Sequence, residues 1–170
     1  MKLLLKLAVI FTLGVVSTVS QAVDIPDPEP VAKKYYELRK SRNFDSVKEM
    51  LFLGHTEISQ AKTLPVVKAD IEQMGVTRPD FTKLIEVKHN NQWAYIIFKT
   101  EKTVKTKHET FNNKSIKDEL MWFNGKEWLV VPQISRYDLF TKVEKDKSML
   151  ELHDWLTKNR KELRLKHCMN

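Results

Sequence analysis

An α+β domain is the fold class that the sequence predicts, and three observations predict it. Apolar residues recur at helical spacing over residues 30–41. Residues 92–98, QWAYIIF, form a nearly continuous apolar run, which is typical of a strand covered on both faces. Asn124-Gly125 separates two apolar runs, as in a tight β-hairpin. Helices that precede a run of antiparallel strands indicate helices packed on one face of a sheet.

The chain opens with a predicted secretory signal peptide, residues 1–22. Lys2 and Lys6 stand ahead of an apolar run from about Leu7 to Val16, and small and polar residues lead from it to Ala22. The run is shorter than the roughly 20 residues that a spanning helix needs. Cleavage after Ala22 would leave residues 23–170 as a periplasmic protein, and the loss of two lysines would lower its formal net charge from +7 to +5.

The scarcity of cysteine and glycine argues against several architectures and activities. Cys168 is the only cysteine, so an intrachain disulfide is excluded. Four glycines in 170 residues leave few places for the strained turn of a serine nucleophile or for a phosphate-binding loop. Acidic and basic residues are interspersed and no aromatic-basic motif occurs, so nucleic acid is not expected as a partner. No cofactor is predicted.

Two short helices are expected after a proline-rich leader, residues 23–29. Pro30 is well placed at the start of the first helix, because a proline in the first turn lacks only an amide that would be unpaired anyway. The second helix is predicted over residues 46–52. Ser46 opens it, with Glu49 three residues later, which is the pattern of a capping box.

Two longer helices are expected further along the chain. Residues 57–74 read as helical, interrupted or restarted at Pro65 and ended by Gly75, which can adopt the left-handed conformation of many helix ends. Residues 146–166 return to helical spacing. Their apolar stripe consists of Met149, Leu152, Leu156 and Leu163.

Antiparallel strands are expected between these helices, joined by turns that contain asparagine. Asn-Gly supplies the positive φ angles that a two-residue hairpin loop needs at both central positions. The predicted turns are Asn90-Asn91, a turn around Asn112-Asn113, and Asn124-Gly125. The predicted strands are residues 82–89, 92–98, 116–123 and 126–132.

The order of three segments, VAKKYYELRKSRNFDSVKEML, NNQWAYIIFKT and ELMWFNGKEWLVV, resembles the nuclear-transport-factor-two-like (cystatin-like cone) superfamily. A strand of the type Gly-Lys-Trp-apolar is frequent there, and residues 124–129 match it with Glu127 inserted. The resemblance covers residues 30–134. It implies a curved antiparallel meander sheet that wraps a helix and leaves a conical pocket. Residues 135–170 depart from the superfamily pattern, and their helix could lie across the mouth of the cone, pack on its outside, or bind a partner.

Four aromatic residues on or beside the predicted strands are the candidate lining of that pocket. If their rings point into the cone, they would suit a small apolar ligand. The alternative is that they form the hydrophobic core beneath the helices, because strand alternation does not say which face is the core. The four residues are Trp93, Tyr95, Trp122 and Trp128.

A lysine-rich stretch, residues 99–114, is the candidate surface for an acidic partner. Most stretches of this kind are solvated strand ends, and that is the alternative reading. The candidate contact residues are Lys99, Lys102, Lys105 and Lys107.

Catalytic and metal sites have little support in the sequence. The resemblance implies that an enzyme of this superfamily would use a general acid or base in apolar surroundings, and the residues near the right strands are Tyr95, His108, Asp118 and Glu119. Nothing in their spacing selects a set, so no catalytic residue is assigned. The histidines do not have the spacing of a metal site, and no metal is predicted.

A non-catalytic periplasmic binding or accessory protein is therefore the predicted function, acting through the cone pocket or the exposed strand face. The expected partner is a small apolar ligand or an acidic envelope protein, and the expected state is a monomer or a homodimer. One alternative is an immunity protein that neutralises an envelope-acting toxin. Another is a pocket isomerase or hydratase with a carboxylate base.

Overall fold

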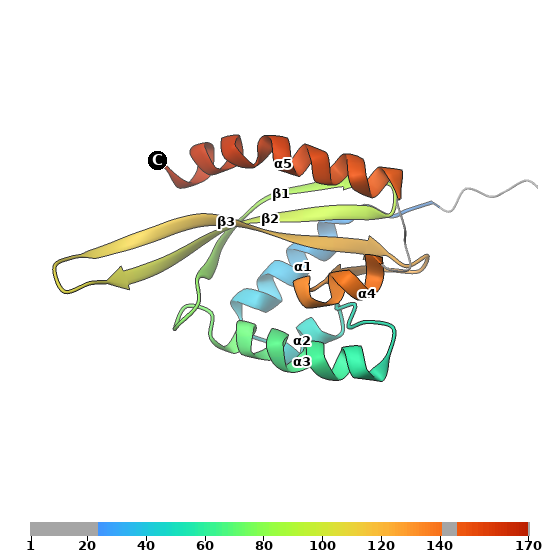
Figure 1. The fold of residues 1–170 in the computed structure, drawn as a ribbon, viewed down its shortest axis with the longest axis horizontal. Helices are drawn as coiled ribbons and strands as arrows, with labels where there is room; N and C mark the ends of the chain where they lie inside the picture. The colour runs from blue at the N-terminus through green and yellow to red at the C-terminus, as the bar shows by residue number, and fades with distance from the viewer. Residues whose placement is uncertain (1–23, 141–145, 170) are drawn as a thin grey trace, which may run out of the picture.

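A computed structural model describes residues 24–140 and 146–169 and confirms the predicted α+β fold class. Four antiparallel strands form one curved meander sheet in the order β1-β2-β3-β4, with helices on both of its faces (Figure 1). The predicted signal peptide lies outside the described residues. The strands are β1 (Asp80–Asn90), β2 (Trp93–Lys105), β3 (Thr110–Phe123) and β4 (Trp128–Val131).

The first two helices form where the sequence predicts helices, but the second begins earlier than expected. α1 spans Glu29–Lys40, with proline in its first turn. α2 spans Phe44–Lys48, and its N-cap is Asn43 rather than Ser46. The Asn43 side chain accepts a hydrogen bond from the backbone N–H of Ser46 at 3.1 Å. The predicted capping box at Ser46 is therefore wrong, because an asparagine three residues upstream already supplies the cap.

The third helix, α3 (Glu57–Glu72), runs through Pro65 without a break. The predicted interruption is therefore wrong. Packing of its buried face compensates for the backbone hydrogen bond that proline cannot donate. That face consists of Thr63, Val67 and Ile71. Gly75, three residues beyond the helix, has a φ of 73°, the left-handed conformation that the sequence predicts there.

The turn between β2 and β3 lies closer to the N-terminus than predicted. Asn112 and Asn113 are inside β3, where they pair with Thr103 and Lys102. The chain reverses at residues 106–109 instead, where the Thr106 N–H donates to the Glu109 carbonyl at 2.8 Å. The Thr106 hydroxyl also accepts the Glu109 N–H at 3.0 Å. This local hydroxyl contact, and not the asparagine pair, fixes the turn.

The Asn124-Gly125 turn forms at the predicted place with a different geometry. Of the two residues only Gly125 has a positive φ, 92°. The Asn124 side chain accepts the N–H groups of Lys126 and Glu127, both at 2.9 Å. The loop thus contains four residues, 124–127, rather than the two that the sequence predicts. An asparagine that bonds the backbone two and three residues ahead stabilises this longer loop.

The central strand β2 is covered on both faces, as its apolar run predicts. One set of alternating residues packs under α1, α2 and α3, and the other packs under the C-terminal helix α5. The strand therefore belongs to two hydrophobic clusters at once. The first set is Ala94, Ile96 and Phe98, and the second is Trp93, Tyr95 and Ile97.

The C-terminal helix α5 (Lys147–Cys168) packs on the face of the sheet opposite α1 and α3 (Figure 1). Its buried residues are leucines of the predicted stripe. Asp146 caps the helix and also accepts the indole N–H of Trp93 at 2.8 Å, which ties the start of α5 to β2. Like the other described helices, α5 does not combine the length and apolarity that crossing a bilayer requires.

Candidate functional site

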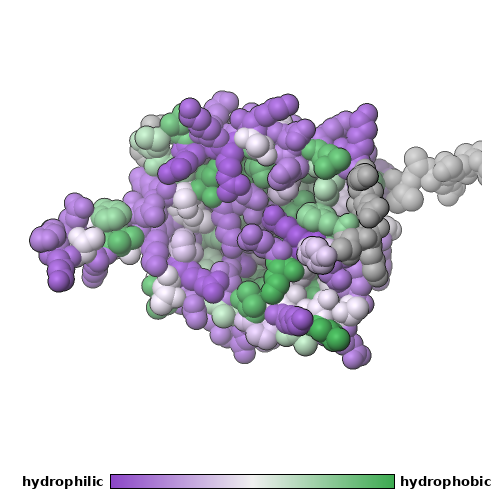
Figure 2. Space-filling model, viewed as in Figure 1, coloured by the Kyte–Doolittle hydropathy of each residue, from purple (hydrophilic) through white to green (hydrophobic). Residues whose placement is uncertain are grey.

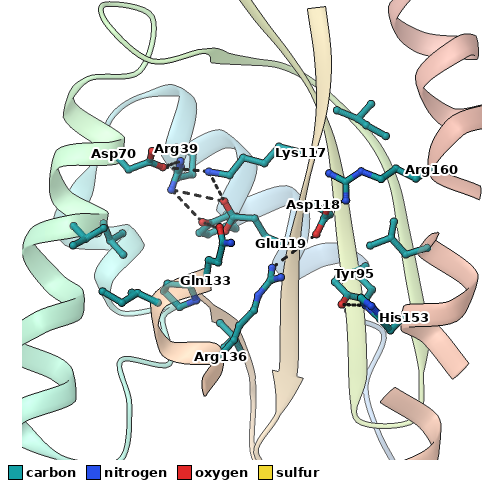
Figure 3. Close-up of a pocket in the computed structure, with 18 of the residues that line it drawn as sticks. Arg39, Asp70, Tyr95, Lys117, Asp118, Glu119, Gln133, Arg136, His153 and Arg160 are labelled. Carbon is teal, nitrogen blue, oxygen red and sulfur yellow. Dashed lines mark hydrogen bonds and ion pairs between the residues drawn. The ribbon is translucent and has the colours of Figure 1, made fainter. Parts of the chain in front are cut away.

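A cavity of about 530 Å³ lies where β4 ends and leaves the edge of β3 uncovered. β4 pairs only with residues 120–123 of β3. Beyond Val131 the chain turns through Pro132 into a short 3-10 helix, Gln133–Ser135, and then into α4 (Arg136–Phe140). Residues 116–119 of β3 therefore line the cavity. Figure 3 shows Lys117 and Glu119 on one face of the strand and Asp118 on the other.

On the α1 side of β3 the cavity contains a buried carboxylate with three partners. Glu119 accepts a hydrogen bond of 2.6 Å from the Tyr35 hydroxyl. Lys117 Nζ lies 3.4 Å and Arg39 Nη1 lies 4.0 Å from the other Glu119 oxygen. Burial by itself would raise the pKa of Glu119, but Arg39, Lys117 and the Tyr35 hydrogen bond outweigh it and lower the pKa. Glu119 is therefore held as a carboxylate.

A second carboxylate, Asp70 on α3, bridges three cations at the rim of the same cluster. Its oxygens lie 2.6 Å from Arg39 Nη2, 2.5 Å from Arg78 Nη1 and 3.3 Å from Lys117 Nζ. Partial burial acts to raise the pKa of Asp70, but these cations lower it to about 2. The guanidinium of Arg39 also lies over the ring of Phe81, 4.7 Å from its centroid. Arg39 is thus fixed between two carboxylates and an aromatic face.

On the α5 side of β3 the cavity contains Asp118 and two arginines. Arg160 Nη1 donates to Asp118 at 2.7 Å. Arg136 lies 3.9 Å from the other Asp118 oxygen, beyond hydrogen-bonding distance. The Tyr95 hydroxyl lies 3.2 Å from Nδ1 of His153. Burial raises the pKa of Tyr95 above its ordinary value, so its phenol stays protonated at neutral pH.

Positive charge exceeds negative charge around this cavity. Five guanidinium or ammonium groups line it against three carboxylates. Within the described part of the chain, Nε of Arg39 and Nε of Arg136 are buried and have no hydrogen-bond acceptor. A buried donor without an acceptor costs roughly 1–3 kcal/mol. The cations are Arg39, Arg78, Lys117, Arg136 and Arg160, and the carboxylates are Asp70, Asp118 and Glu119.

Apolar side chains complete the lining. Val66 on α3 and Ile134 after β4 are each 46% exposed, and both border the cavity. Val131, Pro132 and Leu156 contribute further apolar surface. The cavity is therefore amphipathic, with charged groups along β3 and apolar groups at its rim.

Among the four predicted pocket aromatics, Tyr95 is the one that lines the cavity. Trp93 is fully buried beneath α5. Trp122 is half-buried, 5.6 Å from the ring of Phe52. Trp128 belongs to the cluster under the N-terminal helices, and its indole N–H donates to the carbonyl of Pro26 at 2.7 Å. Trp93 and Trp128 thus belong to the two hydrophobic clusters, and Trp122 packs against one of them.

The four predicted basic-face lysines lie along the hairpin of β2 and β3, away from the cavity. Lys99 and Lys102 are half-buried, and the Lys102 ammonium donates to the carbonyl of Thr77. Lys105 and Lys107 are exposed at the end of the hairpin. The hairpin extends well beyond the body of the protein (Figure 1).

Of the residues considered for acid-base chemistry, Tyr95, Asp118 and Glu119 meet at the cavity, whereas His108 lies in the exposed turn at the end of the hairpin. The described residues contain no group of three or more His, Cys, Asp or Glu side chains that could hold a metal ion.

Sequence reasoning missed the arginines of the site and Asp70. A signal for Arg39 was available, because Arg39 follows Tyr35 by four residues and so continues the apolar stripe of α1. Glu119 likewise alternates with Met121 and Phe123, which are buried on the inner face of β3. A charged residue in an apolar stripe marks a buried ion pair.

Comparison with known proteins gives a likeness of fold. No family model matches the chain, and no curated protein matches it. Among solved structures, the chain is similar to a protein of Campylobacter jejuni described as a candidate NTF2-like transpeptidase. The two share 17% identity over 64% of this chain and 100% of that chain, with a TM-score of 0.40.

Proposed function

We propose that this protein is a non-catalytic, exported binding protein whose edge cavity takes a ligand with both an anionic group and an apolar part. The observation that carries the proposal is the surplus of cations around an amphipathic cavity. A ligand oxygen would contact the accessible part of the Arg136 side chain, which is 21% exposed. The apolar part of the ligand would cover Val66 and Ile134 at the rim.

Arg136 is the strongest candidate for the anion contact. Among the described residues its one ion pair is the 3.9 Å contact with Asp118, and its side chain is 21% exposed. Arg160, by contrast, already donates to Asp118 at 2.7 Å. A planar guanidinium with free donors matches a carboxylate or phosphate group in a two-point contact.

The state of the buried carboxylate favours binding over catalysis. A general base works best when its pKa lies near the operating pH. Glu119 instead has a lowered pKa and is occupied by Tyr35 and Lys117. Asp118 is occupied by Arg160. These contacts support a binding role and weigh against the isomerase or hydratase alternative.

Export is part of the proposal and is supported by the sequence of residues 1–22. A charged start, an apolar run and small residues before Ala22 are typical of a cleaved secretory signal. A periplasmic location would give the cavity access to ligands of the cell envelope.

A series of ten-carbon probes with different head groups tests the proposed function. We expect decanoate to bind in isothermal titration calorimetry, and decylamine, with the same chain and the opposite charge, not to bind. Arg136→Gln should weaken decanoate binding by about 10- to 100-fold, because a hydrogen bond to a charged group contributes roughly 1.5–3 kcal/mol.

The matched control is Arg164→Gln. Arg164 is exposed on α5, one turn beyond Arg160, and does not line the cavity, so this variant should bind decanoate as the unmodified protein does. Equal binding of decanoate and decylamine would contradict the proposal. An unchanged affinity in Arg136→Gln would contradict the assignment of the anion contact.

Inhibition of an acidic envelope protein is a second candidate function, favoured by the projecting hairpin. Figure 2 shows it as a mainly hydrophilic protrusion from the body. Lys105 and Lys107 are exposed there, and Phe111 is 44% exposed on the opposing strand. Lysines beside an exposed aromatic ring are a suitable surface for an acidic cleft.

For this second function we expect the protein, immobilised and exposed to envelope extract, to retain an acidic protein that mass spectrometry identifies. Charge reversal by Lys105→Glu with Lys107→Glu should abolish its retention, because like charges at the contact repel. Reversal of two exposed lysines on α5, Lys158→Glu with Lys161→Glu, is the control and should leave it unchanged. If both double variants lost retention of the acidic protein equally, the cause would be the change in net charge and not a contact at the hairpin.

A further inference from the structure

The direction of the backbone groups along β3 follows from two hydrogen bonds at its end. The Phe123 N–H donates to the carbonyl of Gln92 at 2.8 Å, on the β2 side. The Asn124 N–H donates to the carbonyl of Glu127 at 3.1 Å, on the β4 side. The register between β2 and β3 continues without a shift through the whole of β3. Odd-numbered residues of β3 therefore direct their backbone groups toward β2, and even-numbered residues direct theirs away from it.

This parity leaves backbone groups at the border of the cavity without a strand partner. Ile116 and Asp118 are even-numbered, and β4 pairs only with residues 120–123. No other strand in the described part of the chain pairs with that side of β3. Both residues line the cavity. A row of open N–H and C=O groups is a template for the addition of an extended chain.

The charges around this edge suit a chain whose side chains alternate between two sides. Lys117 and Arg39 lie on the α1 side of β3, and Arg136 and Arg160 lie on its α5 side (Figure 3). Successive side chains of an extended peptide also point to opposite faces. Acidic side chains on either face of an added strand would thus meet a cation. Val66 and Ile134 offer apolar contacts at the outer rim.

We propose that the anionic ligand is an extended acidic peptide segment that adds to β3 beside Ile116 and Asp118 and continues the sheet where β4 ends. This inference rests on the proposed function, and it specifies the class of ligand. Affinity would come from backbone hydrogen bonds to the open edge of β3, and preference for acidic side chains would come from the cations on both faces.

Backbone N-methylation of a probe peptide tests strand addition directly. The probe is an acetylated, amidated hexapeptide of alternating glutamate and valine, and its binding is measured by isothermal titration calorimetry. One derivative carries N-methyl groups on every glutamate nitrogen, and the other carries them on every valine nitrogen. In an added strand only one of the two sets of N–H groups faces β3. We expect one derivative to lose about tenfold or more in affinity and the other to bind like the parent peptide.

Substitution of Ile116 by proline tests the same edge from the side of the protein. Proline removes an N–H that faces away from β2, so the ladder between β2 and β3 is kept. Ile116→Pro should lower the affinity for the parent peptide about tenfold. Ile116→Val keeps the N–H and should leave that affinity unchanged. Circular dichroism checks that both variants are folded. If Ile116→Pro is unfolded, the two methylated peptides with the unmodified protein still decide the question.

Decanoate, titrated in parallel, separates this inference from the proposed function. If decanoate binds and the two methylated peptides bind equally, or the parent peptide does not bind, strand addition is overturned while an anion-binding cavity stands. If neither decanoate nor the parent peptide binds, both proposals are overturned. Concentration-dependent dimerisation in analytical ultracentrifugation that disappears in Ile116→Pro would also overturn the inference, because a second copy of the chain would then occupy the edge.

Discussion

Substitution of Arg39 by methionine is expected to lower the free energy of unfolding by about 3–5 kcal/mol, the cost of breaking a buried ion pair by removing one partner. Arg39 is 2% exposed and lies between Asp70 and Glu119. Without it Glu119 would remain buried with Tyr35 and the half-exposed Lys117 as its partners. Urea unfolding at neutral pH, followed by circular dichroism, measures the change.

Two further variants separate the effect of charge from that of shape. Lys34→Met, an exposed position on the same helix, should change the free energy of unfolding by less than about 0.5 kcal/mol. Adding Glu119→Gln to Arg39→Met should recover part of the loss, because the carboxylate that lacks its partner is then neutral. A loss of equal size in the double variant and in Arg39→Met would show that packing, and not charge, explains the effect.

Substitution of Trp93 by alanine is expected to lower the free energy of unfolding by a similar amount, about 3–5 kcal/mol. A loss of this size is typical when a large aromatic side chain is removed from a core. Trp93 is fully buried between β2 and α5, and its indole N–H donates to Asp146, the cap of α5. The substitution would remove core volume and also the link between the sheet and the start of the helix. The same urea titration measures the loss.

Trp93→Phe is the informative comparison for this second effect. Phenylalanine retains most of the apolar volume and lacks the indole N–H. We therefore expect a smaller loss in the free energy of unfolding: on the order of 1 kcal/mol for the missing hydrogen bond, and a further cost for the altered packing. If Trp93→Ala unfolds like the unmodified protein, the assignment of Trp93 to the core beneath α5 is wrong.

The fold could be predicted from the sequence because its signals are local. The apolar run at residues 92–98 identifies a doubly covered strand, and the periodic leucines of residues 146–166 identify a helix with one buried stripe. Errors occurred where two local signals compete. Asn43 and Ser46 can each cap a helix, and in the structure the upstream residue does so. The asparagines at 112 and 113 read as a turn, but they continue the pairing of a long hairpin.

The candidate site could not be predicted, because it depends on where β4 stops. Arg39 and Glu119 are 80 residues apart in the sequence, and only the order of the strands brings α1 beneath β3. The approach of Arg136 to Asp118 likewise follows from the turn of the chain at Pro132. No local sequence pattern predicts the contact of Arg39 with Glu119 or that of Arg136 with Asp118. What the sequence does offer is a charged residue in each apolar stripe, which indicates a buried pair without naming its partner.

The short fourth strand has a mechanical consequence for the molecule. Because β4 ends early, the edge of β3 opens between two layers of helices that the sheet otherwise separates, and one cavity borders both α3 and α5. A molecule bound at this edge of the sheet would contact both helix layers at once. Its binding energy would then oppose the detachment of either layer, so occupancy would make two hydrophobic cores resist unfolding together.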